Sequence, residues 1–340
     1  MKNKYYLVTP IVLFAVFVTF LNGLSFGEQI VYCGDGTHSG ECSGNKPYYC
    51  DNGILIENVV ECGCSEILEN KEGICFSEYF TDEINASFKY ILRGKENYID
   101  LVLYKGVEEY VSNLPRIITH GVDEEVVLSD FKLKNINDEI QREALVPLVV
   151  AIQNKAKSKE EQARIAISLV QNIPYKKTDK LINLSINQQV ESSRYLYDVL
   201  YENEGVCGEK SDLLSFLLKE LGYGTVIFHY SYENHEAVGV RCPAEYSLGD
   251  TGYCFIESTG PSIISYSKGT YVNGYTLSSI PELILVSRGN SLSDKMYEYE
   301  DADELETINR IIASTHKINV FMKSKLEDFE EKYGMNLVAD

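Results

Sequence analysis

Three residues, in the order Cys207, His235 and Glu257, have the types that nucleophilic catalysis by a thiol requires. A cysteine nucleophile needs a nearby base, and the base needs a polar group that orients it. Cys207 lies in the segment G-V-C-G-E-K-S, at the start of an apolar run that predicts a helix ending at Gly222. The dipole and the free N–H groups of a helix N-terminus favour a thiolate. This position therefore suits a reactive cysteine.

The strand pattern brings the other two candidates together. His235 opens one β-like run and Glu257 closes the next, so an antiparallel pairing would set the two side chains opposite each other. Gly239 shares the face of His235 and is expected to leave room there for the start of the helix. His229 is an alternative base, although no carboxylate on a matching strand is obvious for it.

The cysteine count predicts one free thiol. The chain has nine cysteines, and an odd number in an oxidising compartment leaves one unpaired. Six lie from Cys33 to Cys75, while Cys242 and Cys254 flank a turn-rich segment between two β-like runs. A disulfide between Cys242 and Cys254 would close that loop. If the first six also pair among themselves, Cys207 is the cysteine that remains.

Residues 1–27 predict export. Lys2 and Lys4 precede an uncharged apolar run from Leu7 to Leu21, which is the pattern of a secretory signal peptide. If the run is not cleaved, it would act as a membrane anchor. In either case the residues from Glu28 onward face the outside, and we expect an extracellular or cell-surface protein.

Residues 28–80 predict a disulfide-rich module. The segment is rich in Gly, Asn and Asp and has hardly any apolar run, so it cannot build its own core. Three disulfides would hold it together, in a connectivity that the sequence leaves open. Zinc is the alternative, but the segment contains no C-x-x-C pair. Its cysteines are Cys33, Cys42, Cys50, Cys62, Cys64 and Cys75.

Residues 81–157 predict a β-rich lead-in that ends in a helix. Two apolar, β-rich runs at 86–92 and 98–104 flank a turn and indicate a hairpin. Residues 138–156 then carry apolar side chains at helical spacing. The segment 158–288, which starts with a further helix, contains all three candidate catalytic residues.

Residues 289–340 predict an acidic segment and one long amphipathic helix over 303–333. Six acidic residues crowd into positions 298–306. Calcium binding is the alternative explanation for them, but no loop of alternating acids with a central glycine is present. A solvated acidic helix start is favoured.

Charge limits the partners. The 340 residues include 51 acidic and 31 basic ones, for a formal net charge of −20. That charge repels nucleic-acid phosphates and an anionic membrane surface alike. The 44% hydrophobic content indicates a globular protein of roughly two domains. No motif calls for a cofactor or a metal.

Four segments together resemble the transglutaminase-like superfamily, in particular its secreted archaeal members. They are Q-N-I-P-Y at 171–175, G-V-C-G-E at 205–209, H-E-A-V-G-V at 235–240 and E-S-T-G-P at 257–261. The resemblance covers roughly residues 158–265. It implies an α+β catalytic domain whose fold is similar to that of papain-type cysteine peptidases.

The resemblance also implies a role for each candidate. Cys207 would be the nucleophile, His235 the general base and acid, and Glu257 the group that orients the imidazole. The backbone N–H of Cys207 would hold part of the oxyanion. The sequence departs from the family at two points. Glu257 stands where an aspartate is usual, and Ala237 stands where an aromatic residue, often tryptophan, is usual.

We therefore expect a secreted or cell-surface cysteine hydrolase that cleaves amide or peptide bonds through an acyl-thioester on Cys207. Its substrate would be a protein or peptide. Two alternatives stay open. One is a transamidase that joins glutamine side chains to lysines of surface proteins, and the other is a catalytically inactive binding module of the cell envelope.

Overall fold

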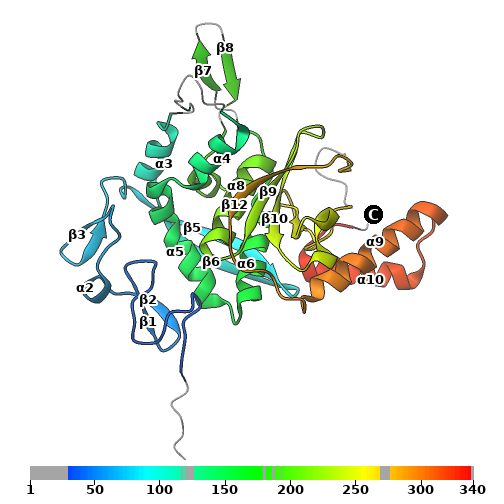
Figure 1. Ribbon diagram of the computed structural model, residues 1–340, viewed down its shortest axis with the longest axis horizontal. Coiled ribbons are helices and arrows are strands. Elements are labelled where there is room, and N and C mark those ends of the chain that lie inside the picture. Colours follow the sequence, from blue (N-terminus) through cyan, green and yellow to red (C-terminus); the bar gives the residue numbers. More distant parts are fainter. Residues whose placement is uncertain are drawn as a thin grey trace, which may run out of the picture.

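The computed structural model describes residues 30–115, 118, 126–178, 181–185, 188–191, 193–268 and 276–337. The fold is α+β, as predicted, with a four-stranded antiparallel sheet packed against helices (Figure 1). The predicted signal peptide or anchor, residues 1–27, lies outside the described residues. Among the described residues, no helix is both long enough and apolar enough to cross a membrane.

The N-terminal module consists of two short hairpins held by three disulfides. Its elements are β1 (Tyr48–Asp51), β2 (Ile54–Glu57), α2 (Val59–Cys62), β3 (Glu69–Lys71) and β4 (Ile74–Phe76). Its disulfides are Cys33–Cys50, Cys42–Cys62 and Cys64–Cys75. Leu55 of this module packs with Val146 and Val150 of helix α5 (Glu139–Lys155). The module thus completes its small core on the neighbouring helix, consistent with its shortage of apolar residues.

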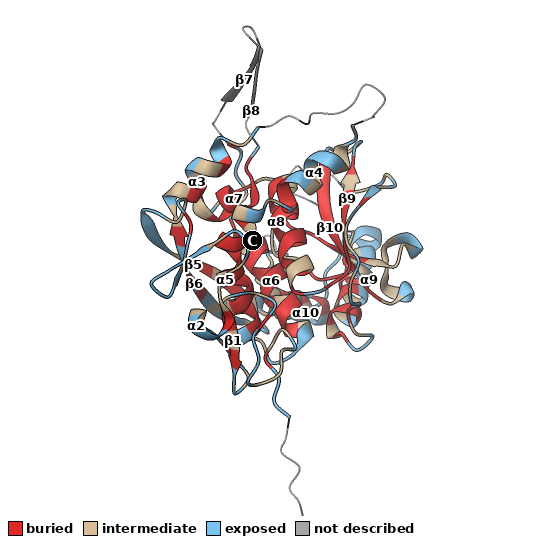
Figure 2. Cartoon of the chain, turned by 60° about the vertical axis from the view of Figure 1, so that its left-hand side comes forward, coloured by how far each residue is buried: buried red, intermediate tan, exposed pale blue. Residues whose placement is uncertain are grey.

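The predicted hairpin of the lead-in is present. Strands β5 (Glu83–Leu92) and β6 (Lys95–Tyr104) pair through a two-residue turn, Arg93-Gly94, in which both residues have positive φ. The other elements up to residue 201 are α3 (Lys105–Ser112), α4 (Leu128–Ile136), α5, α6 (Lys159–Asn172), β7 (Leu181–Ser185), β8 (Gln188–Glu191) and α7 (Leu196–Tyr201). One apolar core joins β6, α5 and α6 to the later elements (Figure 2).

The central sheet has the strand order β11-β10-β9-β12. Its strands are β9 (Thr225–Tyr230), β10 (His235–Arg241), β11 (Tyr253–Ile256) and β12 (Glu282–Ser287). Ile227 and Val238 face helix α8 (Cys207–Glu220) and belong to the main core, whereas Phe228, Ala237 and Phe255 form a smaller cluster on the opposite face. The predicted Cys242–Cys254 disulfide closes the connection between β10 and β11.

Gly239 has another role than the predicted one. A Cβ atom at this position would lie 2.5 Å from Val226 Cγ2 and 2.8 Å from the ring of Phe228. Because neighbouring residues on a strand alternate in direction, Gly239 faces away from the side that Val238 presents to α8. The glycine therefore makes room for Phe228, and not for the start of the helix.

The prediction of one long C-terminal helix is wrong. The segment forms two helices, α9 (Tyr297–Thr315) and α10 (Val320–Tyr333), and His316 between them adopts a left-handed φ of 53°. Asn319 caps α10 by accepting a hydrogen bond from the Met322 N–H at 2.9 Å. The reversal lets Met322 and Leu326 pack back against Leu305, whereas a straight helix would leave this apolar stripe uncovered.

The acidic residues at 298–306 lie inside α9. Glu298 is buried and forms a two-bond ion pair with Arg164 of α6, so the start of this helix is not simply solvated. No group of three or more His, Cys, Asp or Glu residues in the described ranges is arranged to hold a metal ion.

We predict that Gly239→Ala destabilises the protein by about 1–3 kcal/mol, because the added methyl group collides with Phe228 and Val226. Chemical unfolding measures the change. Gly260→Ala is the matched control, since a Cβ at Gly260 meets no atom within 4 Å. Equal stability of the two variants would contradict the described packing.

Candidate functional site

Helix α8 places Cys207 at the edge of the core. Leu213, Leu214 and Leu217 are fully buried and hold the helix against the sheet, whereas Cys207, the first helical residue, stays partly exposed. The other eight cysteines form the four disulfides, and Cys207 is free. The predicted division of the cysteines is confirmed.

The structure brings the three predicted residues together. His235 Nε2 is 3.0 Å from Glu257 Oε2, and His235 also hydrogen bonds the Cys207 side chain. Since Nε2 faces the carboxylate, Nδ1 is the ring nitrogen left for the thiol. His235 and Glu257 are both buried, so water does not compete strongly for the imidazole.

The strand register differs from the predicted one by one diagonal step. Val238 pairs with Ile256, so Glu257, just beyond the end of β11, lies level with Ala237. His235 is two residues further along β10 on the same face. The Glu257 side chain, which is longer than that of an aspartate, spans this diagonal. If the two residues lay directly opposite each other, the extra length would not be needed.

Two contacts hold the His235 proton. Burial alone would lower the pKa of His235, but hydrogen bonds to Cys207 and Glu257 outweigh it and raise the pKa to about 9. The imidazole is therefore protonated at neutral pH. Its proton stabilises the fold below pH 6.5, and this contribution disappears as the pH rises through about 9.

The Glu257 carboxylate is itself fixed. Its Oε1 accepts hydrogen bonds from the N–H of Thr259 at 2.8 Å and from its hydroxyl at 2.6 Å. The side chain of Gln171 donates to the Glu257 carbonyl at 2.9 Å. With Oε1 occupied in this way, Oε2 is directed at His235, which suits the role of orienting the imidazole.

Lys210 is a site residue that sequence reasoning missed. Its side chain is fully buried, and Nζ donates to the carbonyls of Ile173 at 2.6 Å and Thr259 at 3.0 Å. Burial lowers the pKa of Lys210 to about 7, and the Glu257 carboxylate offsets part of this effect. Lys210 thereby ties the segments 171–175 and 257–261 to the helix that carries Cys207. In the sequence, a lysine on the apolar face of the helix that begins at Cys207 is the feature that could have identified this residue.

The loop before Cys207 is held by Glu209. Its carboxylate accepts from the N–H of Val206 at 2.9 Å and from the N–H of Arg194 at 2.8 Å. Tyr175 lies beside this loop, because its backbone pairs with Gly205. Burial and the nearby Cys207 raise the pKa of Tyr175, so its hydroxyl stays protonated and can donate a hydrogen bond.

His229 has the carboxylate partner that the sequence did not reveal. His229 Nδ1 is 2.9 Å from Glu236 Oε1, and the other Glu236 oxygen accepts from Lys132 Nζ at 2.5 Å. Lys132 also pairs with Asp212 at 3.0 Å. Glu236 and His235 are neighbours on β10 and point to opposite faces. This second network nevertheless reaches the start of α8, because Lys132 Nζ lies 3.5 Å from the carbonyl oxygen of Gly208, the residue after Cys207.

In comparisons with known proteins, no family model, no curated protein and no solved structure matches this chain.

We predict that His235 titrates near pH 9 and that its pKa falls toward 6.5 in Glu257→Gln, because the carboxylate holds the proton. NMR of the histidine ring signals measures both values. Glu304→Gln is the control, because Glu304 pairs with Lys325 on the C-terminal helix pair, and it should leave the titration of His235 unchanged. A pKa near 6.5 in the unmodified protein would rule out the described contacts.

We predict that Lys210→Met destabilises the fold by about 1–3 kcal/mol, since buried carbonyls lose their donor. Unfolding in urea measures the loss. Lys219→Met on the same helix is the control, because Lys219 is partly exposed and donates to Asn137 Oδ1 at 2.8 Å in an exposed contact, and we expect a change below about 1 kcal/mol. Two equal losses would mean that Lys210 does not clamp these segments.

Proposed function

We propose that the protein is a transglutaminase-like cysteine hydrolase that cleaves amide or peptide bonds. The observation that carries the proposal is that His235 contacts both the free thiol of Cys207 and the fixed carboxylate of Glu257. This is the arrangement of nucleophile, base and orienting group that thiol catalysis requires.

Acylation uses the protonated His235. The Cys207 thiolate, whose proton His235 already holds, attacks the carbonyl carbon of the amide, and the carbonyl oxygen becomes an oxyanion. The backbone N–H of Cys207, at the first position of α8, and the hydroxyl of Tyr175 are the donors available to it. The C–N bond then breaks, His235 gives its proton to the departing amine, and Cys207 holds the acyl group as a thioester.

His235 acts as an acid in acylation and as a base in deacylation. The neutral His235 takes a proton from water, and the water oxygen attacks the thioester carbon. The C–S bond breaks, the carboxylic acid departs, and the pair of Cys207 and protonated His235 is restored. A primary amine in place of water would give transamidation by the same steps.

The disulfides indicate where the protein acts. Four disulfides in the described residues indicate an oxidising environment outside the cytoplasm. A free thiol that persists there beside a protonated imidazole fits a catalytic role better than a structural one. Proteins or peptides at the cell surface are the substrates we propose.

We predict that an amide-based probe with a thiol-reactive group labels Cys207, and that Cys207→Ala abolishes labelling. His235→Ala should lower the labelling rate by about 10²–10⁴-fold, the usual contribution of a positioned base. Mass spectrometry of the labelled peptide measures both results. His229→Gln is the control, because its network lies on the other face of β10, and it should label as the unmodified protein does.

The reaction product shows whether water or a primary amine accepts the acyl group from Cys207. Hydrolysis releases a carboxylic acid from a peptide substrate, whereas transamidation incorporates a labelled primary amine into a glutamine-bearing protein.

A thiol that reacts at the rate of an ordinary exposed cysteine in both unmodified protein and His235→Ala would contradict catalysis and favour an inactive binding module.

A further inference from the structure

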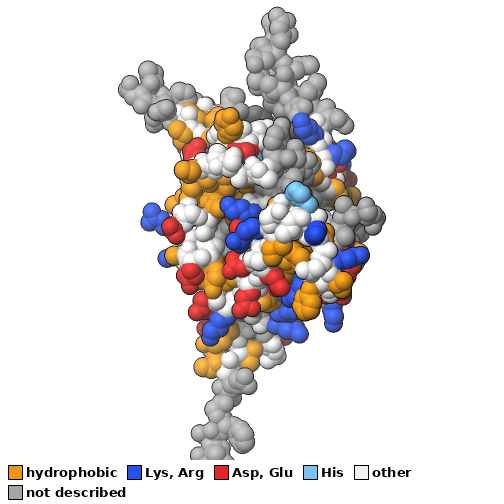
Figure 3. All heavy atoms as spheres, turned by 90° about the vertical axis from the view of Figure 1, so that its right-hand side faces the viewer, with side chains coloured by type: hydrophobic (Ala, Val, Ile, Leu, Met, Phe, Trp, Pro, Cys, Tyr) orange, Lys and Arg blue, Asp and Glu red, His pale blue; other side chains and the backbone are white. Residues whose placement is uncertain are grey.

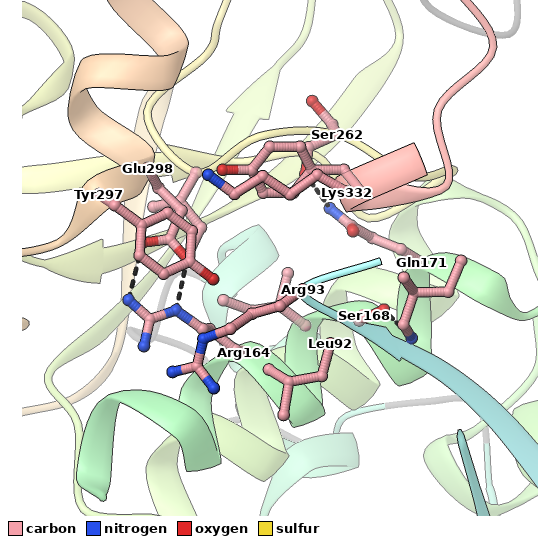
Figure 4. Close-up of a pocket in the computed structure, with 13 residues that line it drawn as sticks. Leu92, Arg93, Arg164, Ser168, Gln171, Ser262, Tyr297, Glu298 and Lys332 are labelled. Atoms are coloured by element: carbon pink, nitrogen blue, oxygen red, sulfur yellow. Dashed lines mark hydrogen bonds and ion pairs between the residues drawn. The ribbon is translucent and has the colours of Figure 1, made fainter. Parts of the chain in front are cut away.

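The base of the C-terminal helix pair, α9 and α10, is fixed to the body of the protein. Arg164 of α6 binds Glu298 of α9, and the N–H of Gly94 in the β5–β6 turn donates to the Lys332 carbonyl of α10 at 3.1 Å. Lys332 Nζ also joins the two helices through Asp301. Arg164 and Lys332 both stack on the ring of Tyr297 (Figure 4). The cavity among these side chains measures about 30 Å³, which is room for little more than a water molecule. It serves as an anchor for the helix pair and not as a ligand site.

The opposite end of the helix pair is apolar and exposed. We call residues 311–323 the hairpin tip; it extends away from the body of the protein (Figure 1). Four large apolar side chains of the tip are in solvent. Their exposed fractions are 43% for Ile311, 52% for Ile318, 87% for Val320 and 82% for Phe321. Such a group of apolar side chains on a water-soluble surface marks an interaction site.

The charge of the hairpin tip is opposite to that of the whole protein. No acidic residue occurs from Thr307 to Leu326. The basic residues in that stretch are Arg310, Lys317, Lys323 and Lys325. Lys325 pairs with Glu304 on α9, while Lys323 is largely exposed and only 3.8 Å from an equally exposed Glu327. From the hairpin side, apolar side chains lie among both basic and acidic ones (Figure 3).

We propose that the hairpin tip docks on an anionic lipid bilayer, with Val320 and Phe321 inserted at the level of the headgroups and Lys317 and Lys323 on the phosphates. Exposed apolar side chains flanked by lysines have the chemistry that interfacial membrane binding uses. A protein partner for such a tip would need an acidic surface with an apolar pocket, whereas a bilayer supplies both features to any tip of this shape.

The absence of tryptophan makes a direct test possible. Phe321→Trp introduces a single indole at the tip, and Tyr232→Trp introduces one at another highly exposed position as the control. Both are made in the chain from Glu28 onward, because every described element lies within residues 30–337. The probe is vesicles of phosphatidylcholine alone or mixed equally with phosphatidylglycerol, at low and high salt.

With the anionic vesicles at low salt, we expect the emission of Phe321→Trp to shift to shorter wavelength and that of Tyr232→Trp to stay unchanged. High salt and phosphatidylcholine alone should reduce the shift. Adding Lys317→Glu and Lys323→Glu to Phe321→Trp should weaken vesicle binding at least about tenfold. Circular dichroism and an unchanged midpoint of unfolding in urea report that each variant is folded.

Three results would overturn the proposal. They are an unchanged emission of Phe321→Trp with anionic vesicles, an equal shift in Tyr232→Trp, and vesicle binding that survives both glutamate substitutions. The first result would favour a protein partner for the tip. None of them bears on catalysis, because the tip variants leave Cys207, His235 and Glu257 in place.

Discussion

Helix α8 carries charged side chains into the core, and the partners that these charges require hold the candidate site together. A buried charge without a partner is strongly unfavourable. Glu209 is paired with Arg194, Lys210 with the carbonyls of Ile173 and Thr259, and Asp212 with Lys132. These partners come from segments far apart in the chain. Packing the helix therefore draws the segments around Cys207 into one place before any of them contributes to chemistry.

The same constraint bears on how a pair of Cys207 and protonated His235 can exist in so acidic a protein. A thiolate at Cys207 adds one more negative charge to a chain of net charge −20. The protonated His235 beside Cys207 opposes that unfavourable background. The first turn of α8 adds its unpaired N–H groups. Short-range contacts thus decide the protonation state, and the overall charge does not.

Local signals in the sequence predicted the parts of the structure that depend on neighbouring residues. Cysteine arithmetic identified Cys207 as the free thiol, and strand parity placed His235 and Glu257 on one face. The hairpin of β5 and β6 and helices α5 and α6 follow from periodicity in the same way. The hairpin and the two helices are encoded within a few residues of themselves, whereas the free thiol follows from the number of cysteines in the whole chain.

The missed features depend on strand register and tertiary contacts that the local sequence pattern does not specify. Lys210 reaches carbonyls 37 and 49 residues away, and no local pattern specifies such partners. The diagonal register of Glu257 depends on which residues of β11 meet β10, and the pairing of His229 with Glu236 depends on the hairpin that joins β9 to β10. The break at His316 has the same origin. Helical periodicity continues through it, but only packing of α10 on α9 covers the apolar stripe.

The net charge of the whole protein does not describe the local charge of the hairpin tip. The sequence-wide charge of −20 predicts repulsion from an anionic surface, yet electrostatic interactions in salt act over only about 8–10 Å. A surface that meets the tip encounters lysines and apolar side chains, and the acidic remainder lies farther away. The two effects then act together, because attraction at the tip and repulsion elsewhere favour a single orientation of the protein on the bilayer. An acidic body therefore restricts how a basic tip binds without preventing it from binding.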